Sequence, residues 1–514
     1  MKKIFYSALA VILAAGLASC SEEALNTAPT TSVSTDGLYE SASTSLTPLN
    51  GIYRSMYTAG WSTGGNTHQC FGISAYNLAA DVMGEDHIMS AQGSGWFWYD
   101  ALYNVKGYYT RSSWRPYDLW NAYYTWIANA NYIIAAKETM TGSASDINYV
   151  VGQAYAIRAY SYFMLAQSFC RTYKGHETDP GVPIYTERTE LGTAGKPRGT
   201  VEQTYAQINA DIDTAIARLS NAHARTHKSH IDLYVASGLK ARICLVQENW
   251  AGAEAAADVA IKGAELTESI NNGMNSLAQA DVLWGAEIVP DQSGIYASFF
   301  MHMCGTSNGG GYGNTALKQI NRQLYKTMGA NDLRRAWWTV PEDDKEDDQV
   351  GYLQNKFRWT NESNYTGDYI WMRVPEMYLT KAEAQLMSGN EAGAKETLST
   401  FMKYRDSDYS CAVLSGTEMG KLTTDETGSL REEIIRQRRI ELWGEYGRIY
   451  DIRRLRQGFE RTKDMGWPSA ALLEGLHTDN PESWDWVLTI PQAEFDANEA
   501  LDQTKDQNPM DSGI

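Results

Sequence analysis

Apolar residues recur every three or four positions in eight long stretches of this chain, which is the spacing of one face of an α-helix. These stretches are 117–137, 147–173, 201–219, 231–247, 251–265, 370–387, 392–404 and 430–455. Alternation with a period of two, which would indicate β-strands, is scarce. The pattern predicts an all-α protein whose helices are interrupted by long loop-rich insertions at about 58–116 and 266–368.

Two of these helical stretches repeat one pattern of small and apolar residues at a constant spacing. The first copy contains Ala241, Leu245 and Ala253, and the second contains Ala382, Leu386 and Ala394. A polar turn follows the first helix of each copy, at 248–249 and at 388–389. A helix pair with a short turn and alanines where the helices cross is the tetratricopeptide unit, and such units stack. We therefore expect a tetratricopeptide-type scaffold, interrupted between the copies by the second insertion.

The first twenty residues have the parts of a bacterial export signal. Lys2 and Lys3 precede an apolar run, 4–17, that is too short to span a bilayer comfortably, and two small residues follow before Cys20. A thiol at this position accepts a diacylglycerol, and the amine freed by cleavage accepts a further acyl chain. We expect a signal peptide at 1–19, lipidation of Cys20, and anchoring to a membrane by lipid.

The composition after Cys20 predicts a tether and one folded part. Residues 20–48 are rich in Thr, Ser and Ala, which suits a flexible tether, and we expect a single helical domain over 49–514. No other segment reaches eighteen consecutive apolar residues. The other cysteines have no CxxC or zinc-type spacing, so no disulfide framework is predicted.

Charge and spacing argue against nucleic acid and metal. The formal charge of -18 at pH 7 would repel phosphates. His223, His227 and His230 are possible metal ligands, as is the acidic run at 342–348, but both groups lie in polar segments. The acidic run also lacks the alternating spacing and the Gly of a calcium loop. We predict solvated loops at both places, with no metal and no cofactor.

Short motifs follow one another along nearly the whole chain after Cys20. They include Leu119-Trp120-Asn121, Arg373-Val374-Pro375-Glu376 and Arg438-Arg439-Ile440-Glu441, with others at 127–131, 153–163, 181–184, 200–213, 448–454, 490–495 and 507–509. In this order they resemble the RagB/SusD family of nutrient-uptake outer-membrane lipoproteins. The family more often has Glu-Gly-Arg where this chain has Glu445-Tyr446-Gly447-Arg448.

The resemblance implies a surface protein that captures oligosaccharide, or in some members peptide. It also implies a partner, because such a protein covers a SusC-like TonB-dependent outer-membrane transporter as a hinged lid. Binding is implied and catalysis is not. Ser21-Glu22-Glu23, directly after Cys20, resembles the acidic signal that places lipoproteins on the outside of the outer membrane.

The charged motif near the C-terminus predicts structure and not catalysis. Arg438, Arg439, Glu441, Arg448 and Asp451 lie at helical spacing, where guanidinium and carboxylate groups pair within and between helices. No nucleophile accompanies them. We interpret the cluster as an ion-paired scaffold.

Aromatic residues are concentrated in the two insertions. A pyranose stacks its C–H groups on an indole face, and its hydroxyls bond to carboxylates and amides at the rim. The candidate contacts are Trp96, Trp98, Tyr99, Asp81, Glu85 and Asp86 in the first insertion, with Trp284 and Tyr296 in the second by analogy with the family. Trp96 and Trp98 follow Gly93-Ser94-Gly95 without helical register, which is typical of an exposed loop. Burial of these rings in the core is the alternative.

Other functions stay open at the level of sequence. A tetratricopeptide adaptor that binds no ligand is one alternative, and a peptide-binding uptake protein is another. The hydrolase motifs G-x-S-x-G and H-E-x-x-H are absent. Glycosidase carboxylates have no local signature, so an enzyme ranks third.

Overall fold

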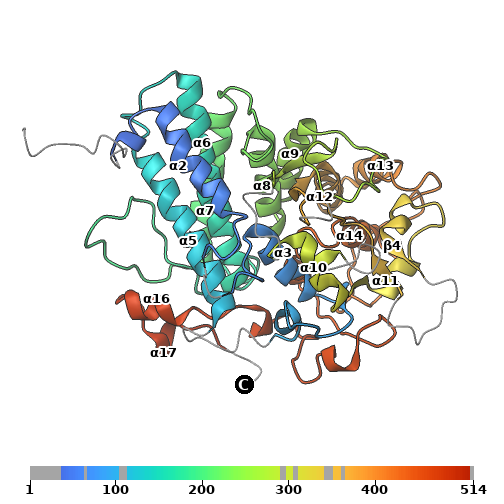
Figure 1. Cartoon of the computed structure of the whole chain (residues 1–514). Coiled ribbons are helices and arrows are strands. Elements are labelled where there is room, and N and C mark those ends of the chain that lie inside the picture. The colour runs from blue at the N-terminus through green and yellow to red at the C-terminus, as the bar shows by residue number, and fades with distance from the viewer. Residues whose placement is uncertain are drawn as a thin grey trace, which may run out of the picture.

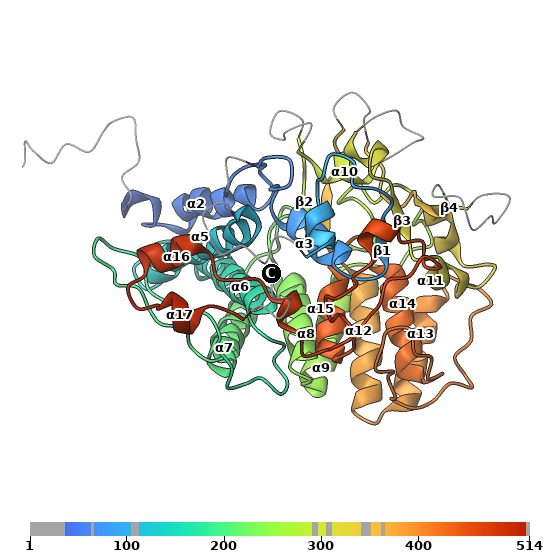
Figure 2. The ribbon, with the colours of Figure 1, turned by 90° about the horizontal axis from the view of Figure 1, so that it is seen from below.

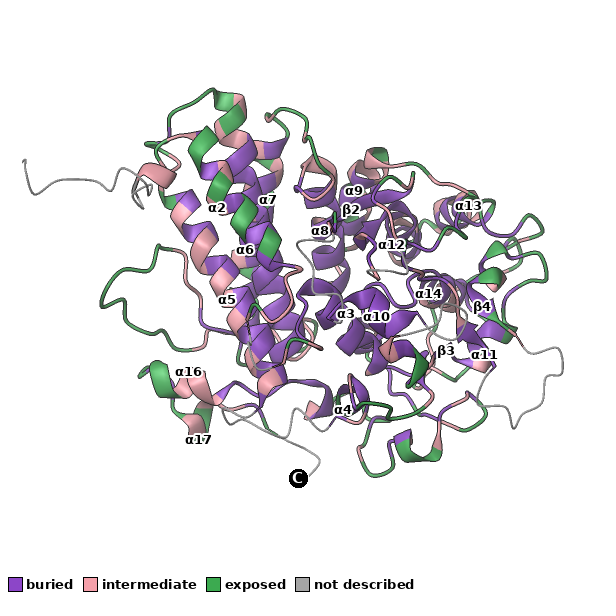
Figure 3. Ribbon diagram, viewed as in Figure 1, coloured by how far each residue is buried: buried purple, intermediate pink, exposed green. Residues whose placement is uncertain are grey.

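Helices build most of this protein, as the periodicity predicts. The computed structural model describes residues 36–62, 66–103, 113–289, 297–304, 311–340, 351–360 and 365–509. Four helices pack together on one side (Figure 1): α2 (Ala42–Ser55), α5 (Trp114–Ala135), α6 (Ala144–Phe169) and α7 (Val201–Leu219). α6 is buried over most of its length, because the other three pack against it (Figure 3). Over the described residues, no helix combines the length and apolarity that crossing a membrane requires.

The first long helix begins earlier than its composition predicts. α2 starts at Ala42, inside the predicted tether 20–48. The Ser41 hydroxyl accepts a hydrogen bond from the Thr44 backbone N–H, and the Thr44 hydroxyl accepts one from the Ser41 N–H. Ser41 and Thr44, two of the residues that suggested a tether, therefore form a capping box. The predicted boundary at 48 is wrong for this reason.

The two repeat copies form two helical hairpins. α8 (Leu233–Val246) and α9 (Trp250–Ala260) make the first, and α12 (Val374–Met387) and α13 (Glu391–Met402) make the second. α9 packs against α12, so the hairpins lie side by side although the second insertion separates them in sequence (Figure 2). The predicted tetratricopeptide-type scaffold is confirmed.

The same cap begins the second helix of each hairpin. The Asn249 side chain accepts a hydrogen bond from the Gly252 N–H at 3.1 Å, and the Asn390 side chain accepts one from the Gly393 N–H at 3.0 Å. Asn is among the best N-cap residues, because its side-chain oxygen pairs with a backbone donor that the helix leaves free. The repeat thus extends from the apolar positions to the turn.

Short strands form two small sheets within the described residues. In spatial order the larger sheet contains β1 (His87–Met89), β3 (Lys318–Ile320), β5 (Leu353–Gln354) and β4 (Trp338–Thr339). β2 (Val282–Ala286) pairs with β6 (Tyr369–Arg373) in antiparallel register. The larger sheet joins the first insertion, through β1, to the second.

Part of one predicted helix is strand β6. The helix predicted over 370–387 begins only at Val374, because Pro375 is favoured in the first turn of a helix. The preceding residues pair with β2, and Val282 lies opposite Arg373. Tyr369-Ile370-Trp371 consists of aromatic and β-branched residues, which favour strands.

The stretch predicted as one helix over 430–455 is two helices. α14 (Leu430–Glu441) and α15 (Arg448–Leu455) are separated by a turn in which Gly444 and Gly447 have φ of 77° and 105°. A side chain on Gly447 would also lie 2.7 Å from the Ala80 Cβ. Glycine tolerates such backbone angles at no steric cost.

Several short helices complete the described part. They are α3 (Ile73–Val82), α4 (Trp98–Ala101), α10 (Phe299–Met303), α11 (Arg322–Lys326), α16 (Gln492–Ala497) and α17 (Gln503–Asp506). The C-terminal segment returns to the four-helix side, where α16 lies beside α5 (Figures 1 and 2). The Trp120 indole N–H donates to Glu494 Oε2 at 3.0 Å there.

Candidate functional site

An aromatic patch forms where the two insertions meet. His68 stacks on Trp96 with ring centroids 4.9 Å apart and planes 12° from parallel. Tyr312 meets Trp96 edge-on at 5.9 Å, and its hydroxyl lies 2.6 Å from His68 Nδ1. Together with Tyr99, these side chains are called the aromatic patch below.

The backbone around Trp96 is held by close contacts. Gly93 has a φ of 53°, and a side chain there would lie 2.8 Å from the Thr315 carbonyl oxygen. Phe97 is buried with a φ of 61°, and its N–H donates to Gln69 Oε1 at 2.6 Å. Positive φ at a residue other than glycine costs free energy, so the surroundings must hold this loop in place. Trp96 is therefore presented by a constrained turn.

The patch offers both a ring surface and hydrogen-bonding groups. Trp96 is partly exposed, and Tyr99 exposes 43% of its surface. Gln92 donates through Nε2 to the Tyr99 hydroxyl at 3.3 Å. The Trp96 indole N–H is itself buried and has no hydrogen-bond partner among the described residues. Such a surface can stack on an apolar ring face, and the exposed Gln92 and Tyr99 side chains can bond to a hydroxyl.

The predicted carboxylates lie inside the protein and face arginines. Asp81, Glu85 and Asp86 are buried, with 3%, 0% and 2% of their surface exposed. Arg439 pairs with Asp86 at 2.7 Å, and Arg448 pairs with Glu85 at 2.9 Å. In this structure none of the three carboxylates presents a surface to a ligand, so we leave them out of the site proposed below.

The charges around Glu85 and Asp81 confirm this structural role. Burial alone would raise the pKa of the Glu85 carboxyl, but the guanidinium groups of Arg448 and Arg439 lower it to about 2. Asp81 accepts hydrogen bonds from the backbone N–H groups of Gly444 and Arg448, at 2.9 and 3.0 Å. These carboxylates therefore fix the turn between α14 and α15 to the first insertion.

Two of the predicted tryptophans lie in the core. Trp98 exposes 4% of its surface. Trp284 exposes none, donates through its indole N–H to the Ser229 carbonyl at 3.0 Å, and packs edge-on against Trp371. In this structure neither ring offers a face for stacking. Tyr296 and Cys20 lie outside the described residues.

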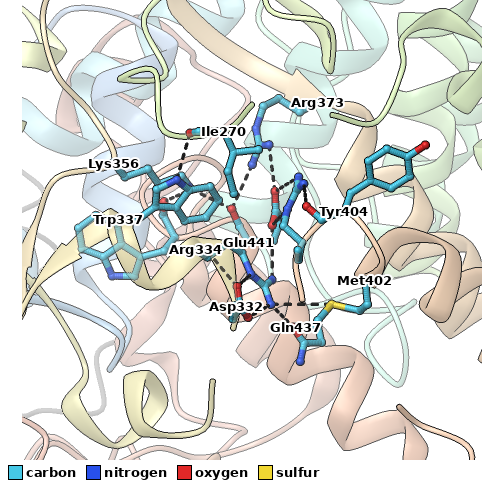
Figure 4. A network of polar contacts seen from close by, with 12 residues as sticks. Ile270, Asp332, Arg334, Trp337, Lys356, Arg373, Met402, Tyr404, Gln437 and Glu441 are labelled. Carbon is cyan, nitrogen blue, oxygen red and sulfur yellow. Dashed lines mark hydrogen bonds and ion pairs between the residues drawn. The ribbon is translucent and has the colours of Figure 1, made fainter. Parts of the chain in front are cut away.

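The arginine scaffold extends through the protein around Glu441 (Figure 4). Arg405 donates from two nitrogens to Glu441, each at 2.9 Å, while Arg373 lies 3.0 Å and Arg334 3.4 Å from the same carboxylate. Burial opposes charge here, but these guanidinium groups hold the pKa of Glu441 well below its usual range. Arg438 likewise pairs with Asp451 at 2.7 Å. The predicted ion-paired scaffold is confirmed.

The histidine segment does not behave as a solvated loop throughout. His230 exposes 8% of its surface, and its ring nitrogens lie 2.7 Å from the Tyr149 hydroxyl and 2.8 Å from Asn50 Oδ1. Burial lowers its pKa to about 4, so it is neutral at pH 7. The prediction is wrong for His230, because Tyr149 and Asn50 replace water. Within the described ranges no three His, Cys, Asp or Glu side chains group as metal ligands, and the run at 342–348 lies outside them.

Sequence reasoning missed His68 as part of the patch. The residue lies in a polar stretch, and its ring partner Tyr312 is 244 positions away in the chain. Nothing in the local pattern indicates such a contact. Trp96 and Tyr99 were found because aromatic residues in a loop with two glycines are unusual.

Solved structures share this fold. A SusD-like carbohydrate-binding protein from Bacteroides vulgatus has a TM-score of 0.74 and 23% identity, covering 92% of this chain and 99% of that chain. A SusD superfamily protein from Bacteroides thetaiotaomicron has a TM-score of 0.68 and 22% identity, covering 91% and 100%. Surface glycan-binding protein A from Bacteroides uniformis has a TM-score of 0.63 and 19% identity, covering 90% and 98%.

Family models match both halves of the chain. A SusD-like model described as starch-binding and associating with the outer membrane matches residues 70–245, and the SusD family model matches residues 295–509. A comparison of the chain with curated proteins found no match. Together the matched ranges span more than half of the chain, in the order that the motifs predict. The chain therefore belongs to the SusD/RagB family.

Proposed function

We propose that this protein captures oligosaccharide at the cell surface and delivers it to a SusC-like TonB-dependent outer-membrane transporter, which it covers as a lid. The aromatic patch carries the ligand part of this proposal, because it combines a partly exposed indole with the exposed polar groups of Tyr99 and Gln92. Two relatives support it: the matching family model is described as starch-binding, and a solved relative is a surface glycan-binding protein.

Sugar binding at the patch follows from its chemistry. The C–H face of a pyranose stacks on Trp96 or on the exposed Tyr99. The exposed amide of Gln92 and the hydroxyl of Tyr99 are the groups at the patch suited to bond ring hydroxyls. His68 and Tyr312 bond to each other and hold the indole, which reduces the entropy lost on binding.

Binding without catalysis is part of the same proposal. A glycosidase needs a carboxylic acid whose pKa is raised, so that it is protonated when it meets the leaving oxygen. The pKa values of Glu85 and Glu441 are shifted the other way, to below their usual range. The buried carboxylates of the scaffold are therefore unsuited to act as general acids at neutral pH.

Anchoring and partner binding complete the proposal. Lipid on Cys20 would hold the protein at the outer membrane, facing outward after the acidic signal at 21–23. The hairpins α8–α9 and α12–α13 are the surface suited to the transporter, because stacked repeats of this kind are built for protein contact.

A glycan array tests the ligand directly. The protein without residues 1–20 is purified, labelled and applied to neutral and charged oligosaccharides. We expect selective binding to at least one neutral glycan. A silent array combined with recovery of partner proteins would favour the adaptor, binding to peptides alone would favour a peptide-uptake protein, and release of new reducing ends would reveal an enzyme.

A further inference from the structure

One buried histidine contacts every segment that supplies the aromatic patch. His302 lies on α10 and exposes 1% of its surface. Its Nε2–H donates to the His68 carbonyl oxygen at 2.7 Å. Its ring meets Phe97 edge-on with centroids 4.9 Å apart, and it lies against Tyr312 at 5.1 Å. Because Phe97 directly follows Trp96, all three parts of the patch converge on this one side chain.

The imidazole of His302 is neutral at pH 7 and carries one proton. Burial, and to a lesser extent the charge of Lys318, lowers the pKa of His302 to about 3. A neutral imidazole has a single N–H, and a carbonyl oxygen can only accept, so the proton lies on Nε2. The ring therefore has one donor, and the His68 backbone uses it.

The helix that carries His302 is itself held by contacts on two sides. The Phe299 N–H of α10 donates to the Tyr369 hydroxyl of β6 at 3.2 Å. At the other end of α10, a Cβ on Gly313 would lie 2.0 Å from the Cys304 carbonyl oxygen. The segment that carries Tyr312 thus lies directly against α10, with no side chain between the two backbones.

We propose that His302 is a positioning residue for the aromatic patch. Its imidazole holds the His68 backbone at a fixed distance from the rings of Phe97 and Tyr312. The His68 ring is thereby kept stacked on Trp96 before a ligand arrives. A surface formed in advance loses less entropy on binding, so His302 strengthens binding without touching the ligand. The effect on binding rests on the proposed function, whereas the ordering of the patch does not.

Two substitutions separate the hydrogen bond of His302 from the packing of its ring. His302→Phe keeps an aromatic ring of similar size and removes the donor, so the His68 carbonyl loses this partner. His302→Gln loses the ring and keeps an amide N–H at about the reach of Nε2. His230→Phe is the matched control, because His230 is a buried histidine that contacts Tyr149 and Asn50 and not the patch.

The first readout needs no glycan and uses the full-length protein in detergent. The chain contains eight histidines, so NMR of ¹³C-labelled histidine gives signals that substitution can assign. The ring current of Trp96, stacked 4.9 Å away, shifts the His68 Cε1–H signal upfield. At about pH 8.5, where exposed histidines are neutral, this signal should move toward that of exposed His477 in His302→Phe. In His302→Gln and His230→Phe it should stay close to its wild-type position.

The second readout is the affinity of the same protein for the glycan selected on the array. His302→Phe should bind about tenfold more weakly, the effect of one well-placed hydrogen bond. His302→Gln should bind within about threefold of the wild type, and His230→Phe should bind normally. Melting curves identify a variant that does not fold. If His302→Phe is such a variant, His302→Asn replaces it, because its amide is too short to reach the His68 carbonyl.

The proposal is overturned if His302→Phe keeps the His68 signal and the affinity of the wild type, since packing of the ring would then suffice. It is also overturned if His302→Gln and His302→Phe lose the signal equally, because the donor would then play no part. A moved signal with unchanged affinity would overturn the effect on binding. If the wild type binds no glycan, the proposed function fails, and the His68 signal alone decides whether His302 orders the patch.

Discussion

At the scale of single residues, the sequence predicts some parts of the candidate site and not others. The charged residues of α14 and α15 were correctly predicted to form an ion-paired scaffold, because charged residues that pair on helices lie at a regular spacing in the sequence. Glu85 and Asp86 were predicted as ligand contacts, but in the structure they are buried against arginines that come from far away: Arg439 lies 353 positions after Asp86. An acidic residue in a loop has the same local pattern whether it faces a sugar or an arginine.

At acidic pH the protein should lose the part of its folding stability that Glu85 contributes. Its folded pKa of about 2 lies below the ordinary 4.5, so the contribution is complete above pH 4.5 and is lost as pH falls toward 2. At pH 7 Glu85→Gln should cost about 3 kcal/mol in free energy of unfolding, measured with urea. The difference in free energy of unfolding between Glu85→Gln and the wild type should shrink steadily below pH 4.5.

Glu426→Gln provides the control for this measurement, because the residue is exposed. Its unfolding free energy should follow the wild type at every pH. A gap between Glu85→Gln and wild type that stays constant from pH 7 to pH 3 would contradict the assigned ion pairs.

At the scale of elements, apolar periodicity predicted where helices exist better than where they end. The periodicity predicted both ends of α7 correctly. It extended α12 backward over β6, however, and joined α14 to α15. Both errors have one physical cause. Strand pairing with β2 and the contact of Asp81 with the Gly444 turn are tertiary interactions, which override a local preference for helix.

The repeated Asn caps should contribute equally to the two hairpins. Asn249→Ala and Asn390→Ala each remove one side-chain acceptor from a helix N-terminus, and each should lower the free energy of unfolding by about 1 kcal/mol. Asn221→Ala, at an exposed site after α7, should change it by less than about 0.5 kcal/mol. If the losses in free energy of unfolding caused by the two cap variants differ by more than the change caused by Asn221→Ala, the two copies are not equivalent.

For the whole molecule, family motifs predicted architecture, whereas ligand contacts depended on how distant loops meet. The matches to family models cover both halves of the chain, yet His68 joins the patch through ring contacts with Trp96 and with Tyr312 of the second insertion. Loop geometry of this kind has no local signature. Sequence therefore indicated the family and only part of the proposed binding surface.

Membrane attachment and partner binding are tested on the same extract. Cys20→Ala should move the protein from the membrane fraction into the soluble fraction, because no other attachment point for lipid is expected. A tagged wild-type protein, extracted in detergent, should recover a TonB-dependent transporter. Membrane retention of the Cys20→Ala monomer would refute the lipid anchor, and repeated extracts without a transporter would refute the lid.

The account rests most heavily on Trp96, and one comparison of affinity with stability tests it. For the glycan selected on the array, Trp96→Ala should lose about 2 kcal/mol of binding, roughly a thirtyfold drop in affinity, and should still fold. Trp98→Ala should instead lose about 3–5 kcal/mol of stability, because Trp98 is buried. Trp250→Ala, at a partly exposed indole on α9, should bind normally. If Trp96→Ala folds and binds the glycan as tightly as wild type, the aromatic patch is not the binding site.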